Sequence, residues 1–199
     1  MTLPRSDSRR IYLARHGETS LNASGLLRGH LDPDLTERGQ RQAEALANTL
    51  DGVGIDLVVA SPLRRAVNTA MAVARQAGLT VATDDDFVDR DYGEWAGSSL
   101  DDVNARWGSI DLAPGVESRS SVIERAMRGL QRVACLEGHG AALIVSHDAV
   151  NRLILSQLDS HLSEPLAQAT GCYNVLSSSE HGWTVESVNN VPRLEDGSA

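Results

Sequence analysis

The sequence predicts an α/β fold, a three-layer α/β/α sandwich with a mostly parallel central sheet. Short apolar runs of strand length alternate with segments whose apolar residues recur at helical spacing, and this alternation is typical of parallel sheets. The length of 199 residues, 41% of them hydrophobic, suits one domain with a single sizeable core. We therefore expect one domain over residues 1–199, with loose tails at about 1–9 and 194–199.

The first strand and the first helix are predicted from short patterns. Residues 10–14 form an apolar run, which predicts a buried strand. Thr36 then opens a segment in which apolar residues recur at positions i, i+3, i+4 and i+7, so we expect a helix with one apolar stripe. The residues of this stripe are Ala43, Leu46, Ala47 and Leu50.

A second strand and a second helix follow. Residues 55–60 are an apolar run rich in Val and Ile, which predicts a strand. Ser61 and Pro62 come next and predict the start of a helix, with Ser61 as its N-cap and Pro62 in its first turn. The inner face of this helix carries Ala66, Ala70, Val73 and Ala77. Residues 80–82 predict a third, short strand.

The rest of the chain continues the alternation. The expected elements are a short helix at 99–107, a long helix at 118–136, a strand at 141–145, a helix at 149–158 and closing strands at 172–176 and 184–188. Apart from the two successive helices at 99–107 and 118–136 and the two closing strands, strands and helices alternate along the chain, which favours an α/β sandwich.

Three polar clusters directly follow predicted strands. They are Arg15–Thr19 after the first strand, Ser61–Arg65 after the second and Ser146–Asp148 after the fourth. Ligands of an open α/β sheet bind outside the carboxyl ends of its strands, so these clusters should meet at one edge. The sequence therefore predicts a pocket that holds two histidines and two arginines.

These side chains suit an anion better than a metal ion. Arginine pairs bidentately with phosphate oxygens, and histidine either donates as an imidazolium or attacks as a neutral base. Flanking guanidinium groups would repel a cation, so we expect no metal site. Phosphoryl transfer requires an in-line nucleophile and charge neutralisation, and this set supplies both. The cationic surroundings should also lower the pKa of His16 and keep it neutral near pH 7.

Composition and charge exclude several classes of protein. The formal net charge of -9 argues against a nucleic-acid partner, because such a partner calls for a basic face. The chain contains no lysine, which excludes Schiff-base chemistry and the lysine of a phosphate-binding P-loop. Residues 1–10 lack an apolar segment and no long apolar run follows, so we expect no membrane partner and a cytoplasmic location.

The segment Leu13–Thr19 resembles the Arg-His-Gly signature of the histidine phosphatase superfamily, the phosphoglycerate mutase-like proteins. Further matches follow in the family's order, and the resemblance covers the chain from about Arg10 to Leu155. They lie at Asn22, Asp32, Leu35–Thr36, Gly39, Gln42–Ala43, Ser61–Ala66, Asp91–Gly97, Pro114–Ser118 and Val145–His147. A lone Arg-His-Gly would be a weak signal, whereas several motifs in the correct order are specific.

The resemblance implies a role for each matching residue. His16 would be the nucleophile that becomes phosphohistidine, with its other ring nitrogen held by a backbone carbonyl. Arg15 and Arg64 would clamp the transferring phosphate. His147 would donate to the same oxygens and stabilise charge in the transition state. Asn22 would line the pocket and help to position the substrate.

Two acidic residues depart from the family's pattern. The family's usual acid is a glutamate, and alignment on the motif that begins at Tyr92 puts Asp89 in its place. Some branches use aspartate, so Asp89 is the expected general acid, with a solvated loop carboxylate as the alternative. Asp148 stands where the family usually has glycine after the second histidine, and we expect it to be a helix N-cap.

These inferences favour a metal-independent phosphatase that hydrolyses a small-molecule phosphomonoester through phosphohistidine on His16, without a cofactor. One alternative is a phosphoglycerate-type phosphomutase. The mutases of the family are longer, with insertions that cover the site, so the short chain favours hydrolysis. A second alternative is a non-catalytic phosphate-binding module. The sequence fixes neither the physiological ester nor the oligomeric state, and a homodimer is compatible with it.

Overall fold

The structure is a computed structural model, and it describes residues 9–136, 138, 140–162, 166 and 168–194. The predicted tails therefore lie outside the described residues at 1–8 and 195–199, whereas Arg9 and Leu194 are described. In chain order the elements are β1 (Arg9–Arg15), α1 (Ser20–Ala23), α2 (Glu37–Thr49), β2 (Ile55–Ala60), α3 (Arg64–Ala77), β3 (Val81–Thr83), the 3₁₀ helices η1 (Asp85–Phe87) and η2 (Gly93–Trp95), α4 (Leu100–Trp107), the 3₁₀ helix η3 (Ile110–Leu112), α5 (Arg119–Cys135), β4 (Ala141–Ser146), α6 (Asp148–Leu158), β5 (Tyr173–Ser179) and β6 (Gly182–Asn190).

The strands form one six-stranded sheet in the order β3-β2-β4-β1-β5-β6. The pairs β2–β3, β2–β4 and β1–β4 are parallel, and the closing strands β5 and β6 add two antiparallel pairs at one edge. The mostly parallel sheet predicted from the sequence is thus confirmed. The pair β1–β4 joins segments that are far apart in the sequence, and it brings the first and third polar clusters to neighbouring strand ends.

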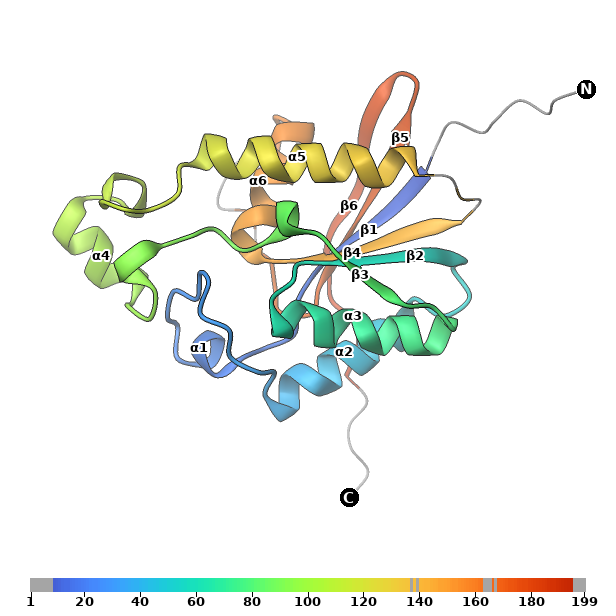
Figure 1. Cartoon of the computed structure of the whole chain (residues 1–199), viewed down its shortest axis with the longest axis horizontal. Helices are drawn as coiled ribbons and strands as arrows, with labels where there is room; N and C mark the ends of the chain where they lie inside the picture. The colour runs from blue at the N-terminus through green and yellow to red at the C-terminus, as the bar shows by residue number, and fades with distance from the viewer. Residues whose placement is uncertain (1–8, 137, 139, 163–165, 167, 195–199) are drawn as a thin grey trace, which may run out of the picture.

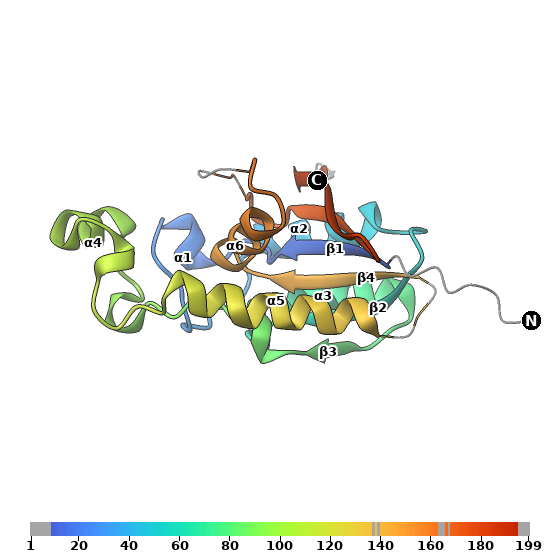
Figure 2. The same ribbon diagram turned by 90° about the horizontal axis from the view of Figure 1, so that it is seen from above.

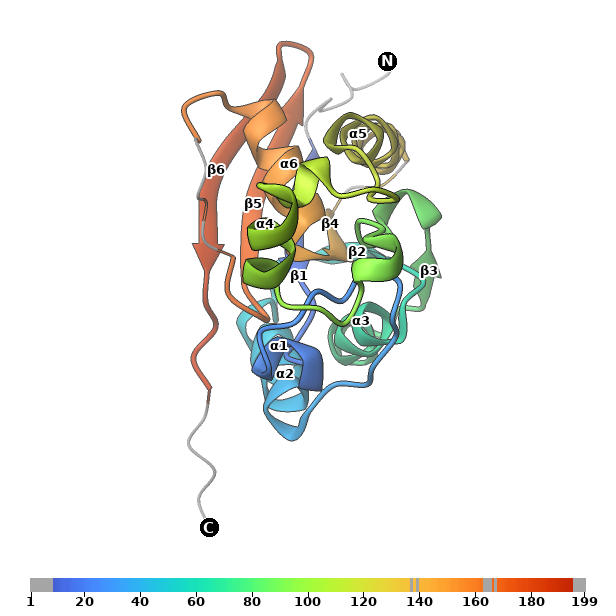
Figure 3. The same ribbon diagram turned by 90° about the vertical axis from the view of Figure 1, so that its left-hand side faces the viewer.

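Helices cover both faces of the sheet. Helices α2 and α3 lie on one face and α5 and α6 on the other, so the molecule has the three predicted layers (Figures 1 and 3). Each face has its own apolar core, and β4 alternates between the two, with Leu143 in the first and Ile144 in the second. Every residue of β4 is buried, because helices exclude water from both sides of a central parallel strand.

Two local predictions are wrong. Helix α3 begins at Arg64 with Leu63 as its N-cap, so Ser61 and Pro62 lie outside it. The reason is that Ser61 continues the sheet, because its N–H donates to the carbonyl of Val145 at 2.9 Å. The N-cap of α6 is His147, and Asp148 is the first residue of that helix. The third strand is confirmed with a shift of one residue, at Val81–Thr83.

The carboxyl ends of the parallel strands point toward α1 and α4. Figure 2 shows the arrowheads of β1 and β4 directed to this end of the molecule. Helix α4 belongs to a third apolar cluster, separate from the two main cores, which contains Leu27, Tyr92, Trp95, Val103 and Ala113. We call residues 91–118 the cap. The loop after α1 is joined to it by a β-bridge between Leu26 and Ser99.

The loop after β1 packs tightly on the start of α2. A Cβ placed on Gly17 would lie 2.4 Å from the carbonyl oxygen of Gly39, and one placed on Gly39 would lie 2.1 Å from that of Glu18. Neither separation is possible for real atoms, so both positions require glycine. This close contact fixes the path of the chain immediately after His16.

No helix in the described part of the chain is long and apolar enough to cross a membrane.

Candidate active site

Two histidines lie next to each other at the carboxyl end of the sheet. β1 and β4 are in register as far as Arg15 opposite Ser146, so the next residues of the two strands, His16 and His147, are neighbours. Their ring centroids are 5.1 Å apart and both side chains are fully buried. The parallel pairing of β1 with β4 therefore brings together the two histidines that the sequence placed at strand ends.

His16 presents one ring nitrogen to the site. Its Nδ1 lies 2.6 Å from the carbonyl oxygen of Gly17, and because a carbonyl only accepts, Nδ1 carries the proton. Nε2 is buried and has no hydrogen-bond partner among the described residues, so its lone pair is unused. Burial, together with the charges of Arg65, Arg15 and Arg28, holds the pKa of His16 well below its ordinary value. His16 is therefore a neutral nitrogen base at neutral pH.

His147 is also neutral and hydrogen-bonded. Its Nε2 is 2.8 Å from the Oγ of Ser61, and its Nδ1 is 3.8 Å from a carboxyl oxygen of Asp89. Burial, followed by the charge of Arg65, lowers its pKa well below the ordinary value. Nδ1 has no hydrogen-bond partner among the described residues. The ring lies between a hydroxyl group and a carboxyl group.

Arg15 lies at the end of β1 and is 11% exposed. Its guanidinium donates from Nη1 to the backbone carbonyl of Gln168 and is 3.9 Å from Asp148. Burial is the main cause that lowers the pKa of Arg15, and the carboxylate of Asp148 opposes the effect. The position of Asp148 after the second histidine thus places an anion beside this arginine, and the same carboxylate forms an ion pair with Arg152 at 3.2 Å.

The second arginine of the pocket is Arg65, and the expectation that it is Arg64 is wrong. The side chain of Arg64 is 61% exposed and forms an ion pair with Asp34. Arg65 is fully buried and donates to the carbonyl oxygens of Leu31 at 2.7 Å and Gly29 at 2.9 Å. Adjacent residues on a helix differ in direction by about 100°. Because α3 begins at Arg64, only Arg65 faces the histidines.

Asp89 lies inside the site. It is 1% exposed, and its Oδ2 accepts from Arg65 Nη2 at 3.0 Å. Its other oxygen accepts from the backbone N–H of Arg90 at 2.9 Å. The alternative of a solvated loop carboxylate is thereby contradicted, since the carboxyl is buried beside His147 and Arg65.

Asn22 lies in α1, near the loop that carries His16. Its Oδ1 accepts from the backbone N–H of Thr19 at 3.0 Å and from the Thr19 hydroxyl at 2.8 Å. The Thr19 hydroxyl in turn accepts from the N–H of Asn22, which makes a reciprocal capping box. The carbonyl oxygen of the amide is therefore used to hold the loop, and the NH₂ group is the donor that remains.

The sequence does not assign Ser61 or Arg28 a role in the site, although both lie in it. Ser61 was expected to cap a helix, yet its hydroxyl contacts His147. Arg28 was not singled out, yet its charge lowers the pKa of both histidines. For Arg65 a signal existed: Thr69, four residues further along α3 and therefore on the same side of the helix, is buried.

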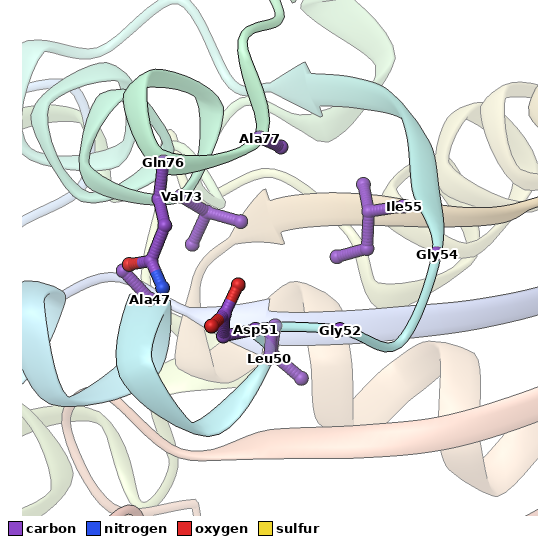
Figure 4. A pocket seen from close by; sticks show the side chains of 9 residues that line it. All are labelled: Ala47, Leu50, Asp51, Gly52, Gly54, Ile55, Val73, Gln76 and Ala77. Carbon is purple, nitrogen blue, oxygen red and sulfur yellow. The ribbon is translucent and has the colours of Figure 1, made fainter.

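A separate cavity of about 200 Å³ opens where α2 and α3 end and β2 begins (Figure 4). Its lining residues are Ala47, Leu50, Asp51, Gly52, Gly54, Ile55, Val73, Gln76 and Ala77. It lies at the amino end of β2, opposite the strand ends that carry the histidines. Within the described ranges, no three His, Cys, Asp or Glu side chains gather in a way that could hold a metal ion.

Comparison with known proteins gives a consistent result. A family model described as the histidine phosphatase superfamily (branch 1) matches residues 11–191. The uncharacterized phosphatase PhoE of Bacillus subtilis is 30% identical over 183 residues, which are 90% of this chain and 93% of PhoE. A 2,3-bisphosphoglycerate-dependent phosphoglycerate mutase of a Methylobacterium species is 32% identical over 176 residues, which cover 79% of this chain and 84% of the mutase.

The fold agrees with solved structures. The α-ribazole phosphatase of Shigella flexneri superposes with a TM-score of 0.80 at 28% identity, and the match covers 94% of this chain and all of that one.

Proposed function

The chain belongs to the histidine phosphatase superfamily, and within it we propose that this protein is a phosphatase that hydrolyses small-molecule phosphomonoesters through a phosphohistidine on His16. The observation that carries the proposal is the buried Nε2 of His16, unpartnered among the described residues and close to the buried Arg65 and to Arg15, which is 11% exposed. Relatives of this chain are named as phosphatases and phosphoglycerate mutases, and both activities are phosphoryl transfers.

In the first half-reaction, the neutral Nε2 of His16 attacks the phosphorus in line with the ester oxygen. Arg15 and Arg65 neutralise the charge on the equatorial oxygens, and His147 donates a hydrogen bond to them. The bond from phosphorus to the alcohol oxygen breaks as the bond to nitrogen forms. Asp89, protonated, delivers its proton to the leaving oxygen, so an alcohol departs and the carboxylate remains.

In the second half-reaction, water replaces the alcohol. The carboxylate of Asp89 takes a proton from this water, whose oxygen attacks the phosphorus. The phosphorus–nitrogen bond breaks, and its electron pair returns to Nε2 of His16. Inorganic phosphate leaves, and both residues regain their starting protonation states. No step uses a metal ion, because the guanidinium groups supply the positive charge.

The arrangement of Arg65 and Asp89 supports these roles. In the free protein the two side chains are paired at 3.0 Å and share one buried site with His147. A bound phosphate competes for the donors of Arg65 and brings negative charge next to the carboxyl group.

The test is hydrolysis of p-nitrophenyl phosphate in the presence of EDTA by the wild type and by His16→Asn. We expect chelator-resistant activity that falls by about 10³-fold or more in the variant, since the nucleophile is lost. His181→Asn is the matched control, because His181 is 88% exposed. Brief mixing with ³²P-labelled ester followed by alkaline quench should trap label on the wild type alone.

Other outcomes would contradict the proposal. Loss of activity in EDTA would exclude metal-free catalysis. Interconversion of 2- and 3-phosphoglycerate that outpaces phosphate release would make the protein a mutase. Binding of inorganic phosphate without turnover of any ester would make it a phosphate-binding module.

A further inference from the structure

Arg28 lies in the segment that forms one wall of the site. The backbone carbonyl of the next residue, Gly29, accepts from buried Arg65 at 2.9 Å. The carbonyl of Asp89 is 3.0 Å from Nε2 of His30, which therefore donates to it. The backbone carbonyl of Leu27 accepts a hydrogen bond from the N–H of Gly97 in the cap at 2.8 Å. The residues on both sides of Arg28 are thus tied to the site and to the cap.

The wall carrying Arg28 is on the side of the leaving group. The proton for the leaving oxygen comes from Asp89, and the segment around Arg28 is bonded to the loop of that residue. Gly29 fits closely against this loop: a Cβ placed on it would be 3.3 Å from the carbonyl oxygen of Arg90 and 3.2 Å from the ring of Tyr92. A side chain in this wall therefore meets the alcohol part of the substrate.

The guanidinium of Arg28 differs from those of Arg15 and Arg65 in that it lacks a carboxylate partner among the described residues. Arg65 is paired with Asp89, and Arg15 has Asp148 at 3.9 Å. Within the part of the chain that the structure describes, Arg28 forms no ion pair: its Nη1 donates to the carbonyl of Leu26 at 3.2 Å, and its Nε is buried without a hydrogen-bond partner. This half-buried cation therefore has no anion paired with it in the described ranges.

The charge of Arg28 reaches the site. It contributes to lowering the pKa of His16 and of His147, and also that of Arg65. A phosphate group held by Arg15 and Arg65 takes up the donors of those two side chains, and the guanidinium of Arg28 is left available to a further anion. A partly buried cation without a counter-ion is costly in free energy, and a second anion on the ligand would relieve that cost.

We propose that Arg28 is a specificity-determining residue that binds a second anionic group, a carboxylate or a second phosphate, on the alcohol part of the substrate. The proposal rests on the phosphatase function proposed above. It narrows the substrate class to phosphomonoesters whose leaving alcohol is itself an anion.

The test uses ligand pairs that differ in one anionic group. O-phosphoserine differs from O-phosphoethanolamine by a carboxylate, and fructose 1,6-bisphosphate differs from fructose 6-phosphate by a phosphate. Each compound competes against hydrolysis of p-nitrophenyl phosphate, whose leaving group lacks such an anion, so an inhibition constant is obtained whether or not the compound is turned over. The enzymes are the wild type, Arg28→Gln, Arg28→Lys and Arg75→Gln, the last of which removes an equal charge from the exposed end of α3.

In at least one pair, we expect the wild type to bind the compound with the additional carboxylate or phosphate about tenfold or more tightly than the compound without it. A charge-assisted hydrogen bond provides a preference of this size. The ratio of the two inhibition constants within that pair should fall to near one in Arg28→Gln. It should recover in part in Arg28→Lys and stay unchanged in Arg75→Gln. The pair that shows the preference identifies the anion as carboxylate or phosphate. Hydrolysis of p-nitrophenyl phosphate should change little in Arg75→Gln, because Arg75 is exposed and lies at the far end of α3.

Two results would overturn the proposal. Equal inhibition within both pairs by the wild type would show that no second anion is recognised. Equal weakening of all four compounds and of p-nitrophenyl phosphate hydrolysis in Arg28→Gln would make Arg28 a third clamp on the transferring phosphate. If the wild type does not hydrolyse p-nitrophenyl phosphate, binding of the four compounds is measured by isothermal titration calorimetry. Selective binding without hydrolysis would then count against the phosphatase function alone.

Discussion

At the scale of single residues, two adjacent arginines have opposite surroundings. Arg65 is fully buried and contacts Asp89, whereas Arg64 points to solvent and pairs with Asp34. Among the neighbouring cations, Arg65 also has the largest effect in lowering the pKa of both histidines. The two side chains carry the same chemistry, so a comparison of their variants isolates the effect of position.

We expect Arg65→Gln to lower kcat/KM for p-nitrophenyl phosphate by about 10²–10³-fold, because a preorganised cation is lost from the transition state. Arg64→Gln should change kcat/KM by less than about threefold, since an exposed ion pair contributes little. Steady-state kinetics of both variants, with circular dichroism to verify folding, measures this. A larger loss in Arg64→Gln than in Arg65→Gln would restore the assignment made from the sequence.

Asp89 offers a test of general acid catalysis. Asp89→Asn keeps the size of the side chain and its acceptor for Arg65 but cannot deliver a proton. We expect kcat/KM for an alkyl phosphate to fall by about 10²–10⁴-fold, because an alkoxide is a poor leaving group. The rate with p-nitrophenyl phosphate should fall much less, since p-nitrophenolate leaves without a proton. If the two esters lost activity equally, Asp89 would not be the acid.

At the scale of elements, the position of the nucleophile depends on how the loop after β1 meets helix α2. Gly17 and Gly39 approach so closely that a Cβ on either would collide with backbone of the other segment. The backbone N–H of Gly17 also donates to Thr69 of α3 at 3.0 Å. Two helices therefore hold the loop that orients the His16 ring through its contact with the Gly17 carbonyl.

Gly39→Ala should therefore weaken both folding and catalysis. An added methyl group at 2.1 Å from the Glu18 carbonyl forces the loop to move. We expect a loss of about 1–3 kcal/mol in the free energy of unfolding, as overpacking typically costs, and a lower kcat. The control is Gln40→Ala, at the exposed next residue of α2, which should stay within about 0.5 kcal/mol of the wild type. Equal melting temperatures for wild type and Gly39→Ala would show that the loop adapts.

At the scale of the whole molecule, the two buried histidines link stability to pH. Both pKa values lie well below the ordinary value of 6.5, chiefly because of burial. Below pH 6.5 the unfolded chain therefore binds protons that the folded protein does not bind. Stability rises with pH up to about 6.5 and loses this dependence above it, with a slope of about 1.4 kcal/mol per pH unit for each histidine.

We expect the free energy of unfolding in urea to be lower at pH 5.5 than at pH 7.5 in the wild type. In His147→Gln the difference between the two pH values should be smaller by about 1.4 kcal/mol, since one buried base is removed. His181→Gln is the control, because an exposed histidine should leave the difference unchanged. If the free energy of unfolding changed between the two pH values by the same amount in His147→Gln as in the wild type, His147 would accept a proton without unfolding of the protein.

Much of the site could be predicted because its residues are set by the ends of strands. The apolar runs located β1, β2 and β4, and each run ends where a functional side chain begins. His16, His147 and Arg15 follow from that pattern, since residues at the ends of adjacent parallel strands must be neighbours. Asp89 lies in no strand and was placed by the family motif alone, and the structure shows it buried with the histidines.

The remaining residues depend on helical phase and on loop packing. The family motif contains two adjacent arginines, and the resemblance was carried to Arg64, whereas the structure places Arg65 in the site and Arg64 at the surface. A shift of one residue rotates the side chain by about 100°, which is enough to move it from the site to solvent. Arg28 belongs to a loop without periodicity, so only the contacts of its neighbours, Gly29 with Arg65 and Leu27 with the cap, reveal where it lies.

The sequence by itself determined the fold class, the family and the two histidines, because strand hydrophobicity and local motifs are properties of short segments. The tertiary structure decided which arginines share the site with them. Those positions depend on close approach between segments far apart in the chain, such as α3 against the Gly29–Leu31 loop. Contacts of that kind arise only when both layers of helices have packed on the sheet, and no short segment encodes them alone.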